Sequence, residues 1–195
     1  MRSVLMAVTI GLILTSSATA AAPRPAAAAY YRNPSSLDTR GLHVQHRTTR
    51  PSALAVRGMT PAKVKMLALI NAERAHAGAR PLHVDATLNA IAQARSQDMI
   101  ARHYFSHRIP GGGMVFDILD RDHVRYAMAG ENIALNNYID FYPLTQTVRQ
   151  TNTDLMNSPE HRANILEFKY AKIGLGMAFE KSSGKLVVTE VFVQS

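Results

Sequence analysis

Apolar residues recur with helical spacing at the start of the region that follows residue 58. Thr60 and Pro61 are typical of a helix start, because threonine caps the first turn and proline suits its first position. The pattern predicts a helix that runs to about Ala77, with Gly78 placed to end it. The residues expected to face the core from this helix are Val64, Leu67, Ala68 and Ile70.

Two further helices are predicted before residue 122. Asp85 caps a helix over about 86–102, and its apolar positions share one helical face: Leu88, Ile91, Ala92 and Met99. The run Pro110-Gly111-Gly112-Gly113 then breaks the pattern and is expected to form a flexible loop, since it lacks the Lys-Ser/Thr of a phosphate loop. A short helix is expected over about 115–121.

The period of the pattern changes in the last third of the chain. A helix is predicted over about 144–156, and Ser158-Pro159 repeats the start signal for a helix that ends near Leu166. The stretch 136–143 is expected to be a polar, aromatic loop. Residues 173–179 and 186–193 are β-rich and joined by a turn, which predicts a hairpin. Helices followed by an antiparallel hairpin predict an α+β domain.

The N-terminus is expected to direct export. Residues 1–20 have a charged start at Arg2, a short apolar run over 4–14 and a small-residue cleavage site at 18–20, which is typical of a signal peptide. The alternative is an uncleaved anchor, although a bilayer crossing needs roughly 20 apolar residues. Residues 21–58 are rich in Ala, Pro and Arg and are expected to form a disordered arm or linker. The globular domain is 59–195, secreted or held in the cell envelope.

Charge and composition narrow the possible partners. Of the net charge of +8, the arm contributes six Arg against Asp38, or +5, whereas residues 59–195 hold 15 Lys and Arg against 13 Asp and Glu, or +2. The arm is therefore expected to approach anionic cell-envelope polymers, and nucleic acid is not an expected partner. The chain has no Cys, which excludes disulfides and a thiol nucleophile. We expect a monomer.

Three short segments carry chemically useful groups that no helical pattern explains: His103–His107, Gly130–Asn132 and Ser158–His161. Two His and a carboxylate suit zinc or a transition metal, or general acid–base chemistry, or they serve only as capping and core residues. Glu131 lies between apolar runs, so its carboxylate requires a partner or has a shifted pKa. A hydrolase elbow Gly-x-Ser-x-Gly is absent from the sequence.

The same segments resemble the bacterial branch of the CAP superfamily, which also contains cysteine-rich secretory proteins, venom allergens and plant pathogenesis-related proteins. The motifs that carry the resemblance occur in family order across about residues 62–193: Ile70–Arg74, Phe105–His107, Gly130–Ala134, Asn157–Leu166, Ile173–Gly176 and Val188–Phe192. The resemblance implies an α-β-α sandwich with a central antiparallel sheet and a large cleft lined by a His/Glu cluster.

In this family the cluster can hold a divalent metal, often zinc. The resemblance places the metal ligands at His107 and His161 and the cleft carboxylate at Glu131. The remaining residues expected in the cleft or behind the ligands are Asn132, Ser158, Glu160 and Glu190. This chain has Leu155 where bacterial relatives usually have Trp, and Glu190 where they usually have Gln. Two His and at most one carboxylate predict weakly bound zinc or another divalent metal.

Three functions follow from these observations. The first is an extracellular module without catalytic activity, whose cleft binds a small ligand such as a lipid, glycan or peptide. The alternatives are a structural role at the cell envelope and a metal-assisted hydrolase. We expect no enzymatic activity, because the sequence supplies no evident oxyanion hole, nucleophile elbow or third firm metal ligand.

Overall fold

The computed structural model describes residues 30–31, 59–137 and 144–194. Their elements, in chain order, are β1 (Tyr30–Tyr31), α2 (Pro61–His76), β2 (His83–Val84), α3 (Ala86–Ala101), α4 (Val115–Arg121), β3 (Met128–Asn137), α5 (Leu144–Asn157), α6 (Pro159–Leu166), β4 (Lys172–Glu180) and β5 (Lys185–Gln194). Every predicted helix is present within about two residues of its expected ends, and the predicted hairpin is β4–β5.

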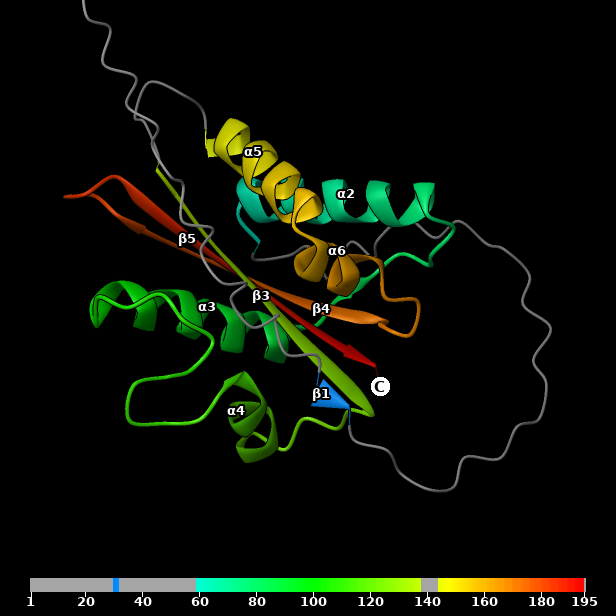
Figure 1. Cartoon of the computed structure of the whole chain (residues 1–195), viewed down its shortest axis with the longest axis horizontal. Helices are drawn as coiled ribbons and strands as arrows, with labels where there is room; N and C mark the ends of the chain where they lie inside the picture. The colour runs from blue at the N-terminus through cyan, green and yellow to red at the C-terminus, as the bar shows by residue number, and fades with distance from the viewer. Residues whose placement is uncertain (1–29, 32–58, 138–143, 195) are drawn as a thin grey trace, which may run out of the picture.

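The described strands form a single sheet in the order β1-β3-β5-β4-β2. All neighbours are antiparallel except β2 and β4, which are parallel. Helices α2, α5 and α6 lie on one side of the sheet, and α3 and α4 lie on the other (Figure 1). The predicted α-β-α sandwich around a mainly antiparallel sheet is therefore confirmed.

Strand β3 was not predicted. It pairs with β5 along its whole length, from Met128 opposite Gln194 to Asn137 opposite Lys185. The prediction of a loop from Asn136 is thus wrong at Asn136 and Asn137, and residues 138–143 lie outside the described part of the chain. Two consecutive buried polar residues, Glu131 and Asn132, interrupt the apolar pattern that marks a strand, so the pattern gave no strand signal.

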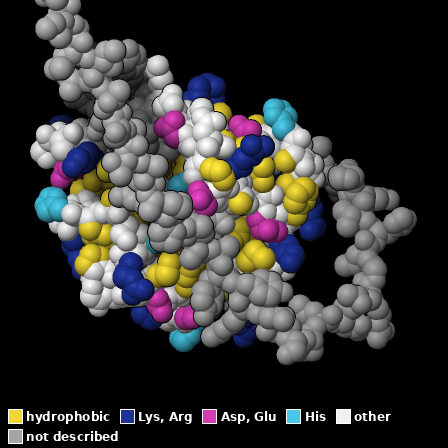
Figure 2. All heavy atoms as spheres, viewed as in Figure 1, with side chains coloured by type: hydrophobic (Ala, Val, Ile, Leu, Met, Phe, Trp, Pro, Cys, Tyr) yellow, Lys and Arg dark blue, Asp and Glu magenta, His cyan; other side chains and the backbone are white. Residues whose placement is uncertain are grey.

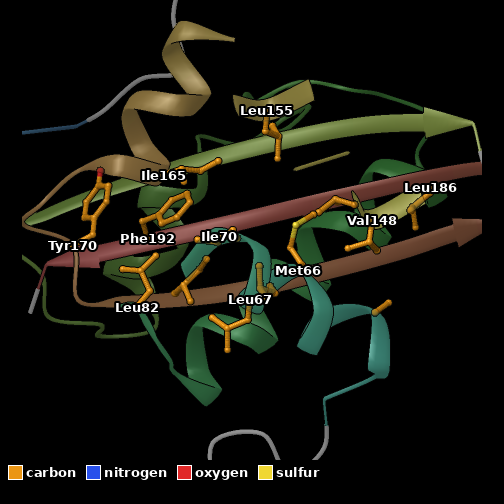
Figure 3. Packing of buried hydrophobic residues seen from close by; sticks show 14 of the residues in the cluster. Met66, Leu67, Ile70, Leu82, Val148, Leu155, Ile165, Tyr170, Leu186 and Phe192 are labelled. Carbon is orange, nitrogen blue, oxygen red and sulfur yellow. The ribbon is translucent and has the colours of Figure 1, made fainter. Parts of the chain in front are cut away.

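The core has a large cluster between the sheet and α2, α5 and α6, where side chains from all three helices meet those of β5 (Figure 3). Tyr170 and Phe192 stack within it at a centroid distance of 5.5 Å. A second cluster lies under α3 and α4 and contains the predicted Leu88, Ile91 and Ala92.

The predicted core face of α2 is correct at two of its four positions and wrong at the other two. Its buried residues are Ala62, Met66, Leu67, Ile70 and Arg74, whereas Val64 and Ala68 are exposed.

Helix α3 packs unusually close to β4. A Cβ atom added at Gly174 would lie 2.1 Å from the carbonyl oxygen of Leu88, and one added at Gly176 would lie 1.9 Å from that of Ala92. Only glycine therefore allows this distance between helix and strand. The spacing of these two glycines is part of what positions α3, and with it the side chains that α3 contributes to the site described below.

Few of the N-terminal predictions fall on described residues. Tyr30 and Tyr31, predicted to be part of a disordered arm, instead pair with Ala129 and Met128 at the edge of the sheet. The rest of 1–58 lies outside the described residues, so the signal peptide and the arm stay predictions.

Within the described residues, no helix combines the length and apolar character that crossing a membrane requires. Basic and acidic side chains are interspersed over the face seen in Figure 2, in keeping with a nearly neutral domain.

Candidate functional site

Glu131 is held by a buried arginine that the sequence analysis did not identify. Glu131 on β3 and Arg95 on α3 are 2% and 1% exposed, and Arg95 Nε donates to Glu131 Oε1 at 3.0 Å. The same guanidinium donates to Tyr104 Oη at 2.5 Å and to the carbonyl of Ser106 at 3.0 Å. A buried charge pair costs little stability only when further hydrogen bonds satisfy it, as they do here. Glu131 is thus fixed in one orientation.

The second oxygen of this carboxylate faces His107. Glu131 Oε2 and His107 Nδ1 are 2.8 Å apart. Because a carboxylate ion can only accept, Nδ1 carries the proton, and in the neutral imidazole the lone pair is then on Nε2. A carboxylate that orients an imidazole in this way is the usual support behind a metal-bound histidine.

His161 has a similar arrangement at the start of α6. Its Nδ1 lies 2.7 Å from Ser158 Oγ, and that hydroxyl donates to Glu160 Oε2 at 3.2 Å. When the hydroxyl proton is in the bond to Glu160, Oγ accepts from Nδ1–H, and the lone pair of the neutral His161 ring is on Nε2. Ser158 occupies the predicted N-cap position of α6, but its side chain makes no capping hydrogen bond, because its hydroxyl is used by His161 and Glu160.

The structure brings the two histidines near each other. Burial lowers the pKa of His161 from 6.5, the nearby His107 lowers it further, and Glu160 partly offsets both. His161 is therefore neutral at pH 7, which is the form that binds metals. His103, by contrast, lies apart from the pair: its side chain is 81% exposed and its Nδ1 is 3.8 Å from Glu180.

Asn132 connects His161 to the sheet. Its Nδ2 donates to the carbonyl of His161 at 3.1 Å and to Glu190 Oε2 at 2.9 Å, while its Oδ1 accepts from Asn164 at 2.9 Å. Glu190 on β5 is fully buried, and its Oε1 has no hydrogen-bond partner among the described residues. Burial raises the pKa of Glu190 to about 7, and the bond from Asn132 opposes this only weakly. Glu190 thus lies behind Asn132, and within the described part of the chain it makes no hydrogen bond to either histidine.

The donor set limits what metal site is feasible. Among residues 59–137 and 144–194, no group of three or more His, Cys, Asp and Glu is arranged to hold a metal ion. The two Nε2 atoms are the available ligands, since both oxygens of Glu131 already have partners. Such a site would leave the remaining coordination positions to water, which suits an exchangeable ion.

Arg95 also lines a cavity of about 750 Å³ between α3 and α4, which neither His107 nor His161 lines. Sequence could have identified Arg95, because it continues the buried row of α3 from Ile91 to Met99 at helical spacing. A charged residue in such a row is almost never fully buried without a partner. The missing partner would have been Glu131, a carboxylate that also lies between apolar runs.

A model of the family described as "CAP: Cysteine-rich secretory protein family" matches residues 67–194. Over 112 residues the chain is 39% identical to the uncharacterized protein YkwD of Bacillus subtilis, covering 57% of this chain and 40% of the relative. An extracellular SCP-domain protein of Bacillus anthracis aligns with a TM-score of 0.56 at 27% identity, over 70% of this chain and 44% of that one. An outer surface protein of Borrelia burgdorferi aligns with a TM-score of 0.58 at 16% identity, over 68% and 92%. The matches thus span less than half of both Bacillus proteins.

Proposed function

The chain belongs to the cysteine-rich secretory protein (CAP) family, and we propose that it is an exported CAP-domain protein that binds a divalent metal ion at His107 and His161. Zinc is the first candidate, because imidazole is among its preferred ligands. Export is supported by the signal-like residues 1–20 and by the extracellular and outer-surface proteins that share the fold.

One observation carries the metal proposal: both imidazoles are held through Nδ1 by groups that accept a proton. Glu131 does this for His107, and Ser158, whose own proton goes to Glu160, does it for His161. Each ring is therefore in the tautomer whose Nε2 can bind a metal. Two such rings close together are more informative than two histidines alone, since a capping or core histidine would not require the same tautomer twice.

The same contacts favour a binding module over a hydrolase. In a Ser-His-carboxylate triad the carboxylate holds the imidazole and the imidazole accepts the serine proton. Here Glu160 accepts from Ser158 instead, so the serine proton points away from His161. We propose a non-catalytic module in which the metal tunes the binding of a lipid, glycan or peptide, with the arm over 21–58 holding the protein near anionic envelope polymers.

Calorimetric titration of the whole chain with zinc tests the metal proposal. We expect one site that disappears in His107→Ala/His161→Ala and remains in the control His76→Ala/His83→Ala. The control removes two exposed histidines from α2 and β2, so it accounts for loose binding to surface imidazoles. Equal binding by the wild type and the His107/His161 variant would refute the site, as would the absence of binding to the wild type.

A second variant tests the tautomer argument. Glu131→Gln keeps the size of the side chain and removes the charge that orients His107. Loss of such a supporting group typically lowers metal affinity by about 10-fold to 100-fold. If zinc bound with unchanged affinity, Glu131 would be a structural partner of Arg95 alone.

A further inference from the structure

The guanidinium of Arg95 is bonded to both parts of the structure that place His107. Its Nε donates to Glu131, whose other oxygen faces the imidazole, and its Nη2 donates to the carbonyl of Ser106 at 3.0 Å. A longer contact of 3.4 Å joins Nη2 to the carbonyl of His107 itself. Arg95 therefore fixes the main chain that carries His107 as well as the carboxylate behind its ring.

The remaining nitrogen of this guanidinium, Nη1, is bonded to Tyr104. It donates to Tyr104 Oη at 2.5 Å, and the same oxygen lies 2.5 Å from Asp98 Oδ2. Since a guanidinium only donates and a carboxylate ion only accepts, the hydroxyl accepts from Arg95 and donates its proton to Asp98. Burial raises the pKa of Tyr104, the bond to Asp98 raises it further, and Arg95 partly opposes this, so the hydroxyl keeps its proton at pH 7.

The ring of Tyr104 is itself held in place. The guanidinium carbons of Arg95 and Arg102 lie 5.9 Å and 5.7 Å from the ring centroid, which is within the range of cation–π contacts. Arg102 also pairs with Asp98 at 3.4 Å and donates to the carbonyl of Pro110. The hydroxyl is therefore kept at one position beside the C-terminal end of α3.

Arg95 has a competing partner on its own helix. Asp98 lies three residues further along α3, a spacing at which opposite charges are neighbours and normally attract. In the structure, however, Arg95 is paired with Glu131, and Asp98 is paired with Arg102. The Tyr104 hydroxyl lies between Arg95 and Asp98 and bonds to both. Without it, Nη1 would be a buried donor with no partner, and a turn toward Asp98 would remove that cost.

We propose that Tyr104 is a positioning residue for the metal site. Its hydroxyl keeps Arg95 on Glu131 and away from Asp98. Glu131 in turn holds the ring of His107 in the orientation that leaves Nε2 to a metal ion. The expected effect on zinc rests on the proposed function, whereas the bond between Arg95 and Glu131 can be measured without a metal.

Tyr104→Phe removes the hydroxyl and keeps the ring. The Nε–H of Arg95 can be followed by NMR in the metal-free whole chain, and its signal is assigned by its loss in Arg95→Lys. We expect slow exchange of this proton with water in the wild type, because it is buried and bonded to Glu131, and at least about tenfold faster exchange in Tyr104→Phe. Zinc affinity measured by calorimetry should fall about tenfold in the same variant.

A double variant separates positioning from a purely structural role. Tyr104→Phe/Asp98→Ala also removes the carboxylate that competes for Arg95, so Arg95 should return to Glu131. Both the slow exchange of Nε–H and the zinc affinity should recover to within about threefold of the wild type. If Tyr104 served only to stabilise the end of α3, the double variant would be weaker than the single one, since Asp98 also pairs with Arg102.

Tyr126→Phe is the matched control, because it removes a hydroxyl that donates to Asp120 on α4 at 2.9 Å rather than to a residue of the site. It should change neither measurement, and exchange accelerated as much as in Tyr104→Phe would overturn the proposal by making the effect a general loosening. Unchanged exchange of the Arg95 proton in Tyr104→Phe would overturn it, as would a double variant that does not recover.

Two further results have a defined meaning. If the wild type bound no zinc, the metal proposal would fail, whereas the exchange of the Arg95 proton would still decide the role of Tyr104. If Tyr104→Phe did not fold, the double variant would decide: a folded double variant with slow exchange supports the positioning role, and an unfolded one refutes it.

Discussion

Replacing Glu190 by glutamine should change how the stability of the protein depends on pH. Glu190 is fully buried on β5, and its Oε1 has no partner among the described residues. Burial raises its pKa from an ordinary 4.5 to about 7. The bond from Asn132 acts in the opposite direction but is weaker, and no charged group contributes to the shift. Charge on this carboxylate is thus unfavourable in the folded protein.

The sign and size of the effect follow from proton linkage. The folded protein binds the Glu190 proton up to about pH 7, whereas the unfolded chain releases it near pH 4.5. Stability is therefore highest below pH 4.5, falls as pH rises through this window, and is constant above pH 7 as far as Glu190 is concerned. The pKa of Glu190 is thus about 2.5 higher in the folded protein than in the unfolded chain. Since one pKa unit corresponds to about 1.4 kcal/mol, the contribution to the free energy of unfolding is about 3 kcal/mol.

Urea unfolding of the whole chain at pH 5, 6, 7 and 8 measures this difference. From pH 5 to pH 8 the stability of the wild type should fall relative to Glu190→Gln by roughly 2–3 kcal/mol. Because only the change with pH matters, a constant cost of the substitution does not affect the result. Glu73→Gln removes a carboxylate at a half-buried position of α2 and is the matched control for the loss of one acidic side chain. If the pH dependence of Glu190→Gln ran parallel to that of the wild type, the reasoning from burial would be refuted.

Four further substitutions test the fold and the site. Arg74→Met removes a buried guanidinium that donates to the carbonyls of residues 80, 165, 167 and 170, and should lower the free energy of unfolding by at least about 3 kcal/mol in urea titrations. Gly176→Ala forces a Cβ against the backbone of α3 and should cost about 3 kcal/mol or more. Gly112→Ala, which meets only Ile109 at 3.5 Å, should change stability by less than about 0.5 kcal/mol. Ser158→Ala should leave the fold intact and lower zinc affinity about tenfold by calorimetry, and unchanged affinity would show that Ser158 does not orient His161.

The helices were predictable because their starts are marked by local chemistry. Thr60 does cap α2 through its side chain, and Asp85 caps α3 with bonds to two amides. The buried face of α2 was less predictable. Four of its five buried residues are spaced four positions apart along the helix, and one of these four is the charged Arg74. A search for apolar positions alone therefore selected some residues beside this row that are not buried. A charge that is satisfied only by distant carbonyls leaves no local mark in the sequence.

The sequence was sufficient to predict which residues form the site, but not how their side chains are arranged. The resemblance to the CAP family identified His107, His161 and Glu131, and the structure places a bonded partner on Nδ1 of each histidine. The helical row of α3 marks Arg95 as a buried position, but its bond to Glu131 crosses the layers of the fold and joins residues 36 apart along the chain. The bond between His161 and Ser158 spans only three residues, yet the sequence does not show that the hydroxyl faces the imidazole and not the amides of the first turn.

The register of β3 determines whether the two histidines can act together. Glu131 and Asn132 are consecutive, and alternate side chains of a strand point to opposite faces. Glu131 therefore reaches His107 beside the α3 layer, and Asn132 reaches the backbone of His161 in the α6 layer. A slip of one residue against β5 would exchange the two faces, moving Glu131 away from the His107 imidazole and Asn132 away from the His161 carbonyl. The full pairing of β3 with β5, including Asn132 opposite Glu190, excludes that slip. The buried bond between Asn132 and Glu190 thus links the stability of the sheet to the placement of His161.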